Sequence, residues 1–169
     1  MQIWDDPTLP RSPGARRLDA EGHRPDPLAL VVDGQLTNWL LDRRTAALLG
    51  LKTNARAVAS GGAIRPSASN VVVSGGTQSQ AELIKGVQRG IFVTEMMGQG
   101  LNPLTGAYSR GAGGFLIEDG ALTQPLQAMT VAGDMAKMFA SLVLGSDVDH
   151  EGSVHVPSVL VPTMKIAGQ

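Results

Sequence analysis

Two Asp-Gly pairs, each placed between short apolar runs, constrain the fold of this chain more than any other feature of its sequence. The joined runs are Leu28–Val32 and Gln35–Leu40 for Asp33-Gly34, and Phe115–Glu118 and Ala121–Gln124 for Asp119-Gly120. A type I′ turn needs positive φ at both central residues, and Asp followed by Gly provides it. Such turns connect antiparallel strands. The sequence therefore predicts two antiparallel hairpins.

Capping residues predict two short helices between the hairpins. Asp42 is suited to be the N-cap of a helix over Arg43–Leu49, with Gly50 just past its end. Ser79-Gln80-Ala81-Glu82 has the spacing of a capping box, in which the Ser and Glu side chains satisfy free N–H groups of the first turn. We expect the helix that it opens to end at Gly90.

A third helix is predicted over Asp134–Leu144, where apolar residues recur at helical spacing. These residues are Met135, Met138, Phe139 and Leu142, and we expect them to face the core rather than a cofactor. Three further runs are predicted strands: Val71–Val73, Ile91–Glu95 and Ser158–Ile166, the last interrupted by Pro162 and therefore expected at a sheet edge. Together these elements predict an α+β fold with an antiparallel or mixed sheet and two or three short-to-medium helices.

The first 27 residues differ from the rest of the chain. They contain five of its ten prolines, with almost no apolar periodicity. Proline fixes φ and removes a hydrogen-bond donor, so this stretch is predicted to be an extended arm without a helix or a central strand. We expect residues 1–27 to join a further N-terminal domain, and residues 28–169 to form the folded C-terminal domain.

Charge and composition exclude several classes of function. Lys and Arg number 14 against 15 Asp and Glu, and only six residues are aromatic, which argues against direct nucleic-acid binding. The chain has no cysteine, which excludes disulfides, a thiol nucleophile and a thiolate metal ligand. The N-terminus lacks the features of a signal peptide, and no apolar run approaches the roughly 20 residues that span a bilayer. These features predict a cytoplasmic protein without a membrane partner.

One segment is similar to a metalloprotease motif. His150, Glu151 and His155 form H-E-x-x-x-H, one residue longer than the H-E-x-x-H in which two His ligands share a helix face and Glu is the general base. On a regular helix the longer spacing turns the second His by about 140°. Gly152 also disfavours a helix. A zinc site there would need a third ligand such as Asp147, Asp149 or His23, so we favour a polar loop, with an independently active zinc peptidase as the alternative.

A glycine-rich stretch over residues 96–114 is predicted to be a long loop. It does not have the G-x-G-x-x-G spacing of a phosphate-binding loop, and a strand follows it rather than a helix. Long loops without regular structure are uncommon and often functional. The residues in and beside it that are candidates for contacting a substrate or a partner are Glu95, Gln99, Asn102, Tyr108, Ser109 and Arg110.

Several segments resemble the C-terminal half of the TldD/PmbA family, whose members carry the description modulator of DNA gyrase. The matching segments are Asp19–Gly22 as D-x-E-G, Asp33-Gly34, Trp39–Arg43, Ala46–Gly50, Val93–Gly100, Thr105–Ala112 and Met164–Gln169. The last three are closer to PmbA, also called TldE, than to TldD. The resemblance covers the chain from Asp5 to Gln169. Because family members are more than twice as long, it implies that this chain is a C-terminal portion.

The family resemblance implies a cytoplasmic heterodimeric peptidase that depends on a metal and degrades or processes small proteins and peptides. In that pairing the TldD-like subunit holds zinc through an H-E-x-x-x-H helix and a cysteine, and the PmbA-like subunit lacks these ligands. This chain has no cysteine, and its only such motif lies near the C-terminus, whereas the family motif lies upstream. The resemblance therefore implies a subunit with no catalytic residue and no cofactor of its own.

Three functions thus remain open from the sequence. The favoured one is the non-catalytic subunit, whose partners would be a TldD-like catalytic subunit and peptide or small-protein substrates. The alternatives are the independently active zinc peptidase and a non-proteolytic binding module that modulates DNA gyrase. Exposed strand edges also predict that the chain can associate with itself.

Overall fold

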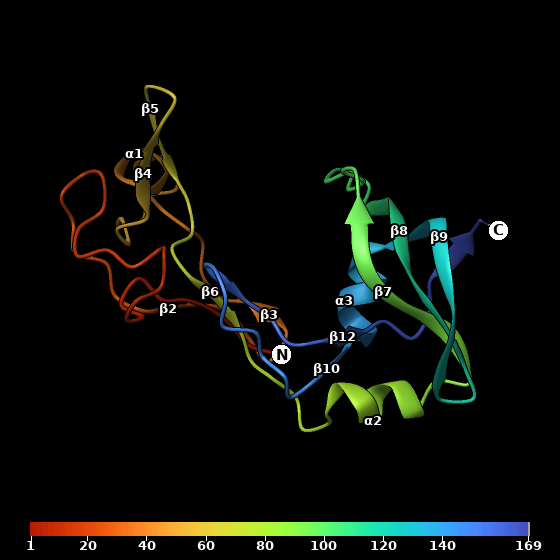
Figure 1. The fold of residues 1–169 in the computed structure, drawn as a ribbon. Helices are drawn as coiled ribbons and strands as arrows, with labels where there is room; N and C mark the ends of the chain where they lie inside the picture. Colours follow the sequence, from red (N-terminus) through yellow and green to blue (C-terminus); the bar gives the residue numbers. More distant parts are fainter. Residues whose placement is uncertain (169) are drawn as a thin grey trace. The chain divides into compact units, whose positions relative to one another are not determined.

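The computed structural model describes residues 1–168, which form two compact units (Figure 1). The first unit comprises Met1–Gly75 and Val148–Pro157. The second comprises Gly76–Asp147 and the chain from Ser158 onward. Strands outnumber helices in this part of the chain and most strand pairs are antiparallel, so the predicted α+β class is confirmed. No helix within residues 1–168 is long and apolar enough to cross a membrane.

The first unit is built on a mixed five-stranded sheet with the order β11-β6-β1-β2-β3. Its strands are β1 (Ile3–Asp5), β2 (Leu28–Val32), β3 (Gln35–Leu36), β6 (Val71–Val73) and β11 (Val154–His155). β1 pairs antiparallel with both β2 and β6, whereas β11 runs parallel to β6. A separate hairpin joins β4 (Ala57–Ser60) to β5 (Ala63–Pro66).

The middle strand of this sheet comes from the proline-rich N-terminus. The prediction that residues 1–27 contain no central strand is therefore wrong for Ile3–Asp5. The first proline is Pro7, so the three residues of β1 keep every donor that a two-sided ladder needs. From residue 6 to 27 the chain has no helix or strand, as proline content predicts. A domain boundary at residue 27 and a junction with a further domain stay predictions.

Both Asp-Gly turns form as predicted. The φ values are 51° and 79° at Asp33 and Gly34, and 49° and 76° at Asp119 and Gly120. The first hairpin is shorter than expected, since β3 has two residues. The second is much longer, since β8 (Ala107–Glu118) and β9 (Ala121–Asp134) have 12 and 14 residues.

The first predicted helix is present as α1 (Arg43–Leu48). Asp42 is its N-cap and forms a reciprocal capping box with Thr45. Gly50 follows the helix with a φ of 67°, the left-handed conformation expected beyond a helix end. The backbone N–H and the hydroxyl of Thr45 hold the pKa of Asp42 below its ordinary value, because both hydrogen bonds favour the ionised carboxylate.

The second predicted helix begins as expected and ends early. α2 (Gln80–Lys85) has Ser79 as its N-cap and Glu82 completing the capping box, but its C-cap is Gly86. Gly90, predicted to end the helix, instead lies inside β7 (Arg89–Met97), where it pairs with Ile117. Gly86 is the first glycine after the start of α2. Because glycine has a low helix propensity, the helix ends there rather than at Gly90.

The third helix, α3 (Met135–Ser141), is shorter than predicted because β9 continues to Asp134. The prediction of a four-residue core stripe is wrong for Phe139, whose residue surface is 50% exposed, while Met135, Met138 and Leu142 are half-buried. Phe139 follows Met138 directly and is therefore rotated by about 100° around the helix axis. Met138 and Phe139 therefore lie at opposite edges of the i, i+3, i+4, i+7 stripe, and the packed face includes only the Met138 edge.

The second unit contains a four-stranded antiparallel sheet with the order β13-β9-β8-β7, in which β7, β8 and β9 are long neighbouring strands (Figure 1). β13 (Lys165–Ala167) lies at one edge, and β10 (Val143–Leu144) pairs with β12 (Val159–Leu160) in a small separate sheet. The C-terminal tail therefore forms short strands on both sides of Pro162, one of them at a sheet edge, as predicted.

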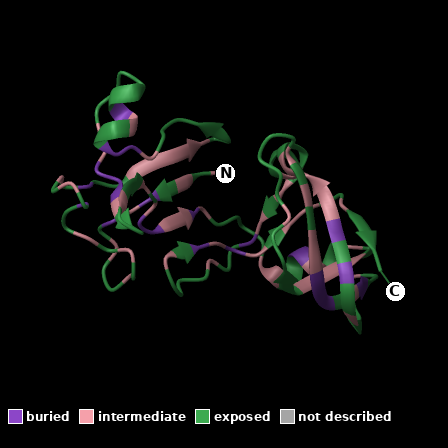
Figure 2. Cartoon of the chain, turned by 90° about the horizontal axis from the view of Figure 1, so that it is seen from above, coloured by how far each residue is buried: buried purple, intermediate pink, exposed green. Residues whose placement is uncertain are grey.

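Few residues are deeply buried in either unit, and much of each is intermediate or exposed (Figure 2). The core of the second unit is Ala112, Met129 and Val131 on adjacent strands β8 and β9. Partly buried Ile91, Val93, Tyr108, Leu126 and Met164 pack against them. The core thus lies on one face of the long meander.

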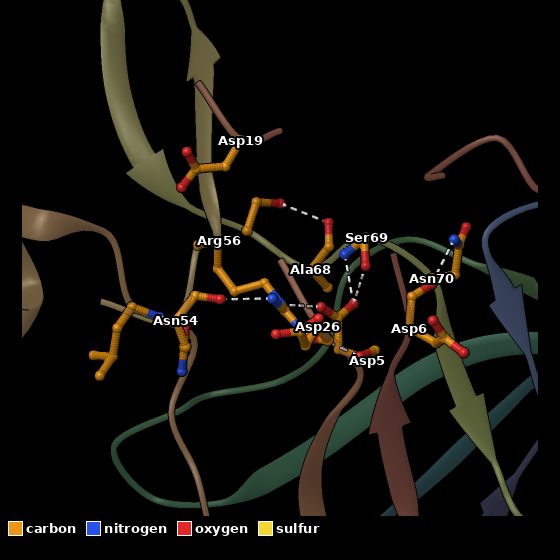
Figure 3. Close-up of polar contacts among 12 residues, drawn as sticks. Asp5, Asp6, Asp19, Asp26, Asn54, Arg56, Ala68, Ser69 and Asn70 are labelled. Carbon is orange, nitrogen blue, oxygen red and sulfur yellow. Dashed lines mark hydrogen bonds and ion pairs between the residues drawn. The ribbon is translucent and has the colours of Figure 1, made fainter. Parts of the chain in front are cut away.

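A buried ion pair holds β1 in the first unit (Figure 3). Arg56 Nε donates to a carboxylate oxygen of Asp5, and both residues are completely buried. The other guanidinium nitrogens donate to the backbone oxygens of Asn54 and Asp26, each at 2.6 Å. The second Asp5 oxygen accepts from the backbone N–H and the hydroxyl of Ser69. Buried charges are tolerated only when they are paired and hydrogen-bonded in this way.

We expect Asp42→Ala to lower the free energy of unfolding by about 1 kcal/mol at pH 7, the usual cost of losing an N-cap. Because the pKa of Asp42 is lowered by folding, its ionised carboxylate stabilises the protein above the unfolded pKa of about 4 and loses this effect as pH falls. The difference in free energy of unfolding between Asp42→Ala and the parent should therefore decrease between pH 5 and pH 3, as measured by urea titrations. Asp42→Asn, an equally good cap without a titrating group, should stay close to the parent at pH 7.

We expect Arg56→Met to lower the free energy of unfolding by about 3–5 kcal/mol, because it leaves the Asp5 carboxylate buried without its partner. The double variant Asp5→Asn/Arg56→Met removes both charges and should lose less than Arg56→Met alone. Arg65→Met is the matched control, since Arg65 is an exposed arginine on β5. Equal losses in the single and double variants, measured by denaturant unfolding, would contradict this account.

Candidate functional site

The H-E-x-x-x-H segment is a turn leading into a strand, as the sequence predicted. Residues 151–153 form a bend and turn, with Gly152 at a φ of 72°, and His155 is the second residue of β11. His150 and Glu151 are exposed, whereas the residue surface of His155 is 4% exposed. The two imidazole rings have centroids 5.5 Å apart. The segment therefore brings the rings near each other without the helix that the metalloprotease motif needs.

Both ring nitrogens of His155 already face polar atoms of this chain. Nε2 lies 3.4 Å from Ser12 Oγ, and Nδ1 lies 3.3 Å from the backbone oxygen of Asp149. Ser12 Oγ in turn donates to Asn70 Oδ1 at 2.6 Å. A metal ion could use His155 only by breaking one of these contacts and exposing a buried ring. His155 therefore acts as a packing and hydrogen-bonding residue between β11 and the N-terminal stretch.

Two of the three possible third ligands, Asp149 and Asp147, have other partners. Asp149 Oδ1 accepts from the backbone N–H of Glu151. Asp147 lies in the second unit, where the Ser158 hydroxyl donates to it and lowers its pKa. Across residues 1–168, no three or more His, Asp or Glu side chains are grouped so that they could hold a metal ion. The residues at the motif do not fit a zinc centre.

The predicted long loop over residues 96–114 is wrong. β7 continues to Met97 and β8 begins at Ala107, so only residues 98–106 connect them. The glycines concealed this strand because glycine has low strand propensity. One of them is required by close packing: a Cβ on Gly114 would lie 1.9 Å from the backbone oxygen of Phe92 on β7. The adjacent backbones exclude any side chain there.

The six predicted contact residues divide among three places. Glu95 is on β7, and Gln99 and Asn102 lie in the connection, where Asn102 Oδ1 accepts from the backbone N–H of Leu104. Tyr108, Ser109 and Arg110 are consecutive on β8. Strand alternation puts Tyr108 and Arg110 on one face and Ser109 on the other. The structure thus brings only some of the six together.

Tyr108 and Arg110 meet at the side chain of Met96. The Tyr108 hydroxyl donates to Met96 Sδ at 3.5 Å, and Arg110 Nη1 lies 4.0 Å from the same sulfur. Met96 pairs with Ala112 of the buried core, whereas Glu95 pairs with Gly113, so their side chains point to opposite faces of the sheet. The polar group on the core face is therefore Tyr108 with Arg110.

Beside this group, the second unit has an apolar cavity of about 530 Å³. Its walls come from α2, β7, β8, β9, α3 and the segment around β12. Of the six predicted residues, Glu95 and Tyr108 line it. Sequence reasoning missed the remaining walls, which include Leu83, Ile84, Val87, Met138 and Val159–Val161. The apolar stripe of α2 was visible in the sequence, but its opposite wall comes from residues more than 70 positions away.

The D-x-E-G motif is structural. Asp19 is buried and its carboxylate accepts from the backbone N–H groups of Glu21, His23 and Ala57. Glu21 Oε2 accepts from the backbone N–H of Arg43 at the start of α1. The motif therefore shapes a turn and connects it to β4 and to a helix N-terminus, which explains its residue types without assigning them a catalytic role.

Residues 1–168 match the family model of the PmbA/TldA metallopeptidase C-terminal domain. This chain belongs to the PmbA/TldD family. It is 37% identical to the metalloprotease PmbA of Escherichia coli over 170 residues, and 32% identical to a PmbA homolog of Haemophilus influenzae. These alignments cover 100% and 99% of this chain but 36% of each relative. The predicted placement in the C-terminal portion of a PmbA-like protein is confirmed.

Solved structures show the same fold. A protein from Bacteroides thetaiotaomicron, described as a candidate modulator of DNA gyrase, superposes with a TM-score of 0.85 at 31% identity, covering 99% of this chain and 36% of that one. TldE from Thermococcus kodakarensis has a TM-score of 0.87 over 99% of this chain and 39% of its own. At 24% identity, the latter supports the fold alone.

We expect His155→Ala to lower the free energy of unfolding by about 1–3 kcal/mol, because it leaves a cavity and removes the ring from its contacts with Ser12 and Asp149. His150→Ala should change stability by less than about 0.5 kcal/mol, since that side chain is exposed. Thermal or denaturant unfolding of the two variants, with and without zinc, distinguishes the two roles of His155. If both histidines held a metal ion, the two variants would lose equal stability in the presence of zinc.

Proposed function

We propose that this PmbA-like chain is part of the non-catalytic subunit of a cytoplasmic heterodimeric peptidase, with the zinc ion held by a TldD-like partner subunit. The complex would degrade or process small proteins and peptides. The observation that carries the proposal is the state of His155, which is buried with both nitrogens facing Ser12 and Asp149. The motif is therefore unsuited to the metal chemistry of the family. No step of peptide hydrolysis is assigned to a residue of this chain.

The second unit has a surface with which such a subunit would bind the substrate. Its meander of β7, β8 and β9 presents an apolar cavity to solvent, with Tyr108 and Arg110 beside it. Apolar surfaces with a few polar groups bind peptides without contributing to bond cleavage. We infer that this surface helps to hold the substrate while the partner cleaves it.

The proposal is tested by zinc content and peptidase activity, with and without a co-expressed TldD-like subunit. We expect this protein alone to retain no zinc above background and to have no peptidase activity. We expect the two subunits to co-purify as a complex that contains zinc and has peptidase activity. Glu151→Gln is the sharpest variant, because Glu151 is exposed and the change is isosteric. It should leave the activity of the pair unchanged.

Two outcomes would contradict the proposal. One zinc ion per chain, together with activity that Glu151→Gln abolishes, would establish the independent zinc peptidase instead. Failure to co-purify with the TldD-like subunit would exclude the heterodimer, and altered supercoiling by gyrase in the presence of the chain would then favour the non-proteolytic binding module. Exposed Lys52→Ala is a control for general surface effects.

A further inference from the structure

Two hydrogen-bond donors of β8 converge on the sulfur of Met96. The Tyr108 hydroxyl lies 3.5 Å from Met96 Sδ, and Arg110 Nη1 lies 4.0 Å from the same atom. A thioether sulfur is a weak hydrogen-bond acceptor. Arg110 Nε is buried and has no hydrogen-bond partner within residues 1–168. The two side chains therefore offer more donor capacity at this point than a thioether satisfies.

Both donors reach the sulfur from the same side. Met96 pairs with Ala112 on β8, and Tyr108 and Arg110 both precede Ala112 on the same face of that strand. The residue surface of Met96 is 39% exposed, so a small solute in water reaches this side chain. An accessible thioether with donors on one side is suited to carry one further acceptor oxygen between the sulfur and the donors.

The neighbouring Met97 lacks these donors. Its residue surface is 51% exposed, which is more than that of Met96. Met97 pairs with Gly111, and a Cβ on Gly111 would lie 3.8 Å from Met97 Cε. Gly111 has no side chain that could donate a hydrogen bond to the sulfur. Comparison of the two methionines therefore separates the effect of the donors from the effect of exposure.

We propose that Met96 is a site of reversible oxidation to methionine sulfoxide by a peroxide, with the new oxygen bound by Tyr108 and Arg110. A lone pair of the sulfur attacks one peroxide oxygen, the O–O bond breaks and an S–O bond forms. The departing oxygen takes the proton of the transferred hydroxyl group and leaves as water, or as an alcohol from an organic hydroperoxide. The sulfur is oxidised and the peroxide reduced, each by two electrons, and a sulfoxide reductase reverses the change.

The position of the donors determines which product forms. The sulfur of methionine sulfoxide is chiral, so oxidation gives two epimers. Because Tyr108 and Arg110 reach the sulfur from one side, they hold the peroxide and then the sulfoxide oxygen on that side. One epimer should therefore form in excess at Met96, whereas Met97 should give both in similar amounts.

Oxidation of Met96 also changes the cavity that we propose to bind substrate. Met96 is one of three methionines among the cavity walls, together with Met138 and Met164. Methionine sulfoxide is polar, so the change replaces an apolar wall group by a polar one and weakens the binding of apolar substrate groups. This consequence rests on the proposed function, whereas the oxidation and its stereochemistry do not.

The test is oxidation of the purified chain by hydrogen peroxide, followed by trypsin digestion and chromatography with mass spectrometry. Residues 90–110 form one tryptic peptide that contains both methionines, and synthetic peptides of each epimer provide the standards. We expect an excess of at least about fivefold of one epimer at Met96, the ratio that a single hydrogen bond typically produces, and nearly equal epimers at Met97. The reductase specific for the major epimer should restore the thioether of Met96.

Tyr108→Phe is the matched variant, because it removes only the hydroxyl that contacts the sulfur. It should lower the excess at Met96 to less than about twofold. Ser109→Ala removes a hydroxyl from the opposite face of β8 within the same tryptic peptide, so it should leave the excess unchanged.

Three outcomes would overturn the proposal: equal epimers at Met96 in the unaltered chain, the same excess at Met96 and Met97, or an excess that Tyr108→Phe leaves unchanged. The first two use the parent protein and do not depend on a variant that folds. All measurements are made on this chain alone, so their failure leaves assembly with the TldD-like subunit untouched. If the excess is found but the subunit never co-purifies, the oxidation site is retained and the heterodimer is excluded.

Discussion

The first unit depends on the buried pair of Arg56 and Asp5. Its sheet has short strands, and the middle one has three residues at the very start of the chain. A strand of three residues forms few hydrogen bonds with its neighbours and buries little apolar area. These two contributions to its stability are therefore small. The guanidinium connects β1 to the backbone at Asn54 and Asp26, and the Asp5 carboxylate adds Ser69. One fully satisfied charge pair thereby connects four distant segments.

The second unit relies on a different principle. Long neighbouring strands joined by tight or short connections bury a small core, and the strands hold Tyr108, Arg110 and Met96 in fixed relation. Groups placed on paired strands are positioned more firmly than groups on a loop. The surface that we propose for substrate binding therefore lies on the longest paired strands within residues 1–168. The H-E-x-x-x-H segment is instead a turn whose buried histidine serves packing.

The contrast between these two segments explains which predictions of local structure were confirmed. Local geometry correctly predicted a non-helical segment at His150–His155, because spacing and Gly152 act within a few residues. The secondary structure around the six candidate contact residues was harder to predict. Composition suggested a loop, whereas Gly111, Gly113 and Gly114 lie in a strand. Their place in the ladder follows from pairing with β7 and β9, and from backbone packing that leaves no room for a Cβ at Gly114.

The sequence by itself determined the two Asp-Gly turns, the caps at Asp42 and Ser79, the α+β class and the family, since each depends on residues that are close together in the chain. Tertiary structure alone decided that Ile3–Asp5 is a central strand and that Arg56 is buried against it. It also decided that α2 and the β12 segment form walls of one cavity together with residues of β7, β8 and β9. These features depend on pairing between residues far apart in sequence, whose free energy comes from burial and from satisfied hydrogen bonds that no local pattern encodes.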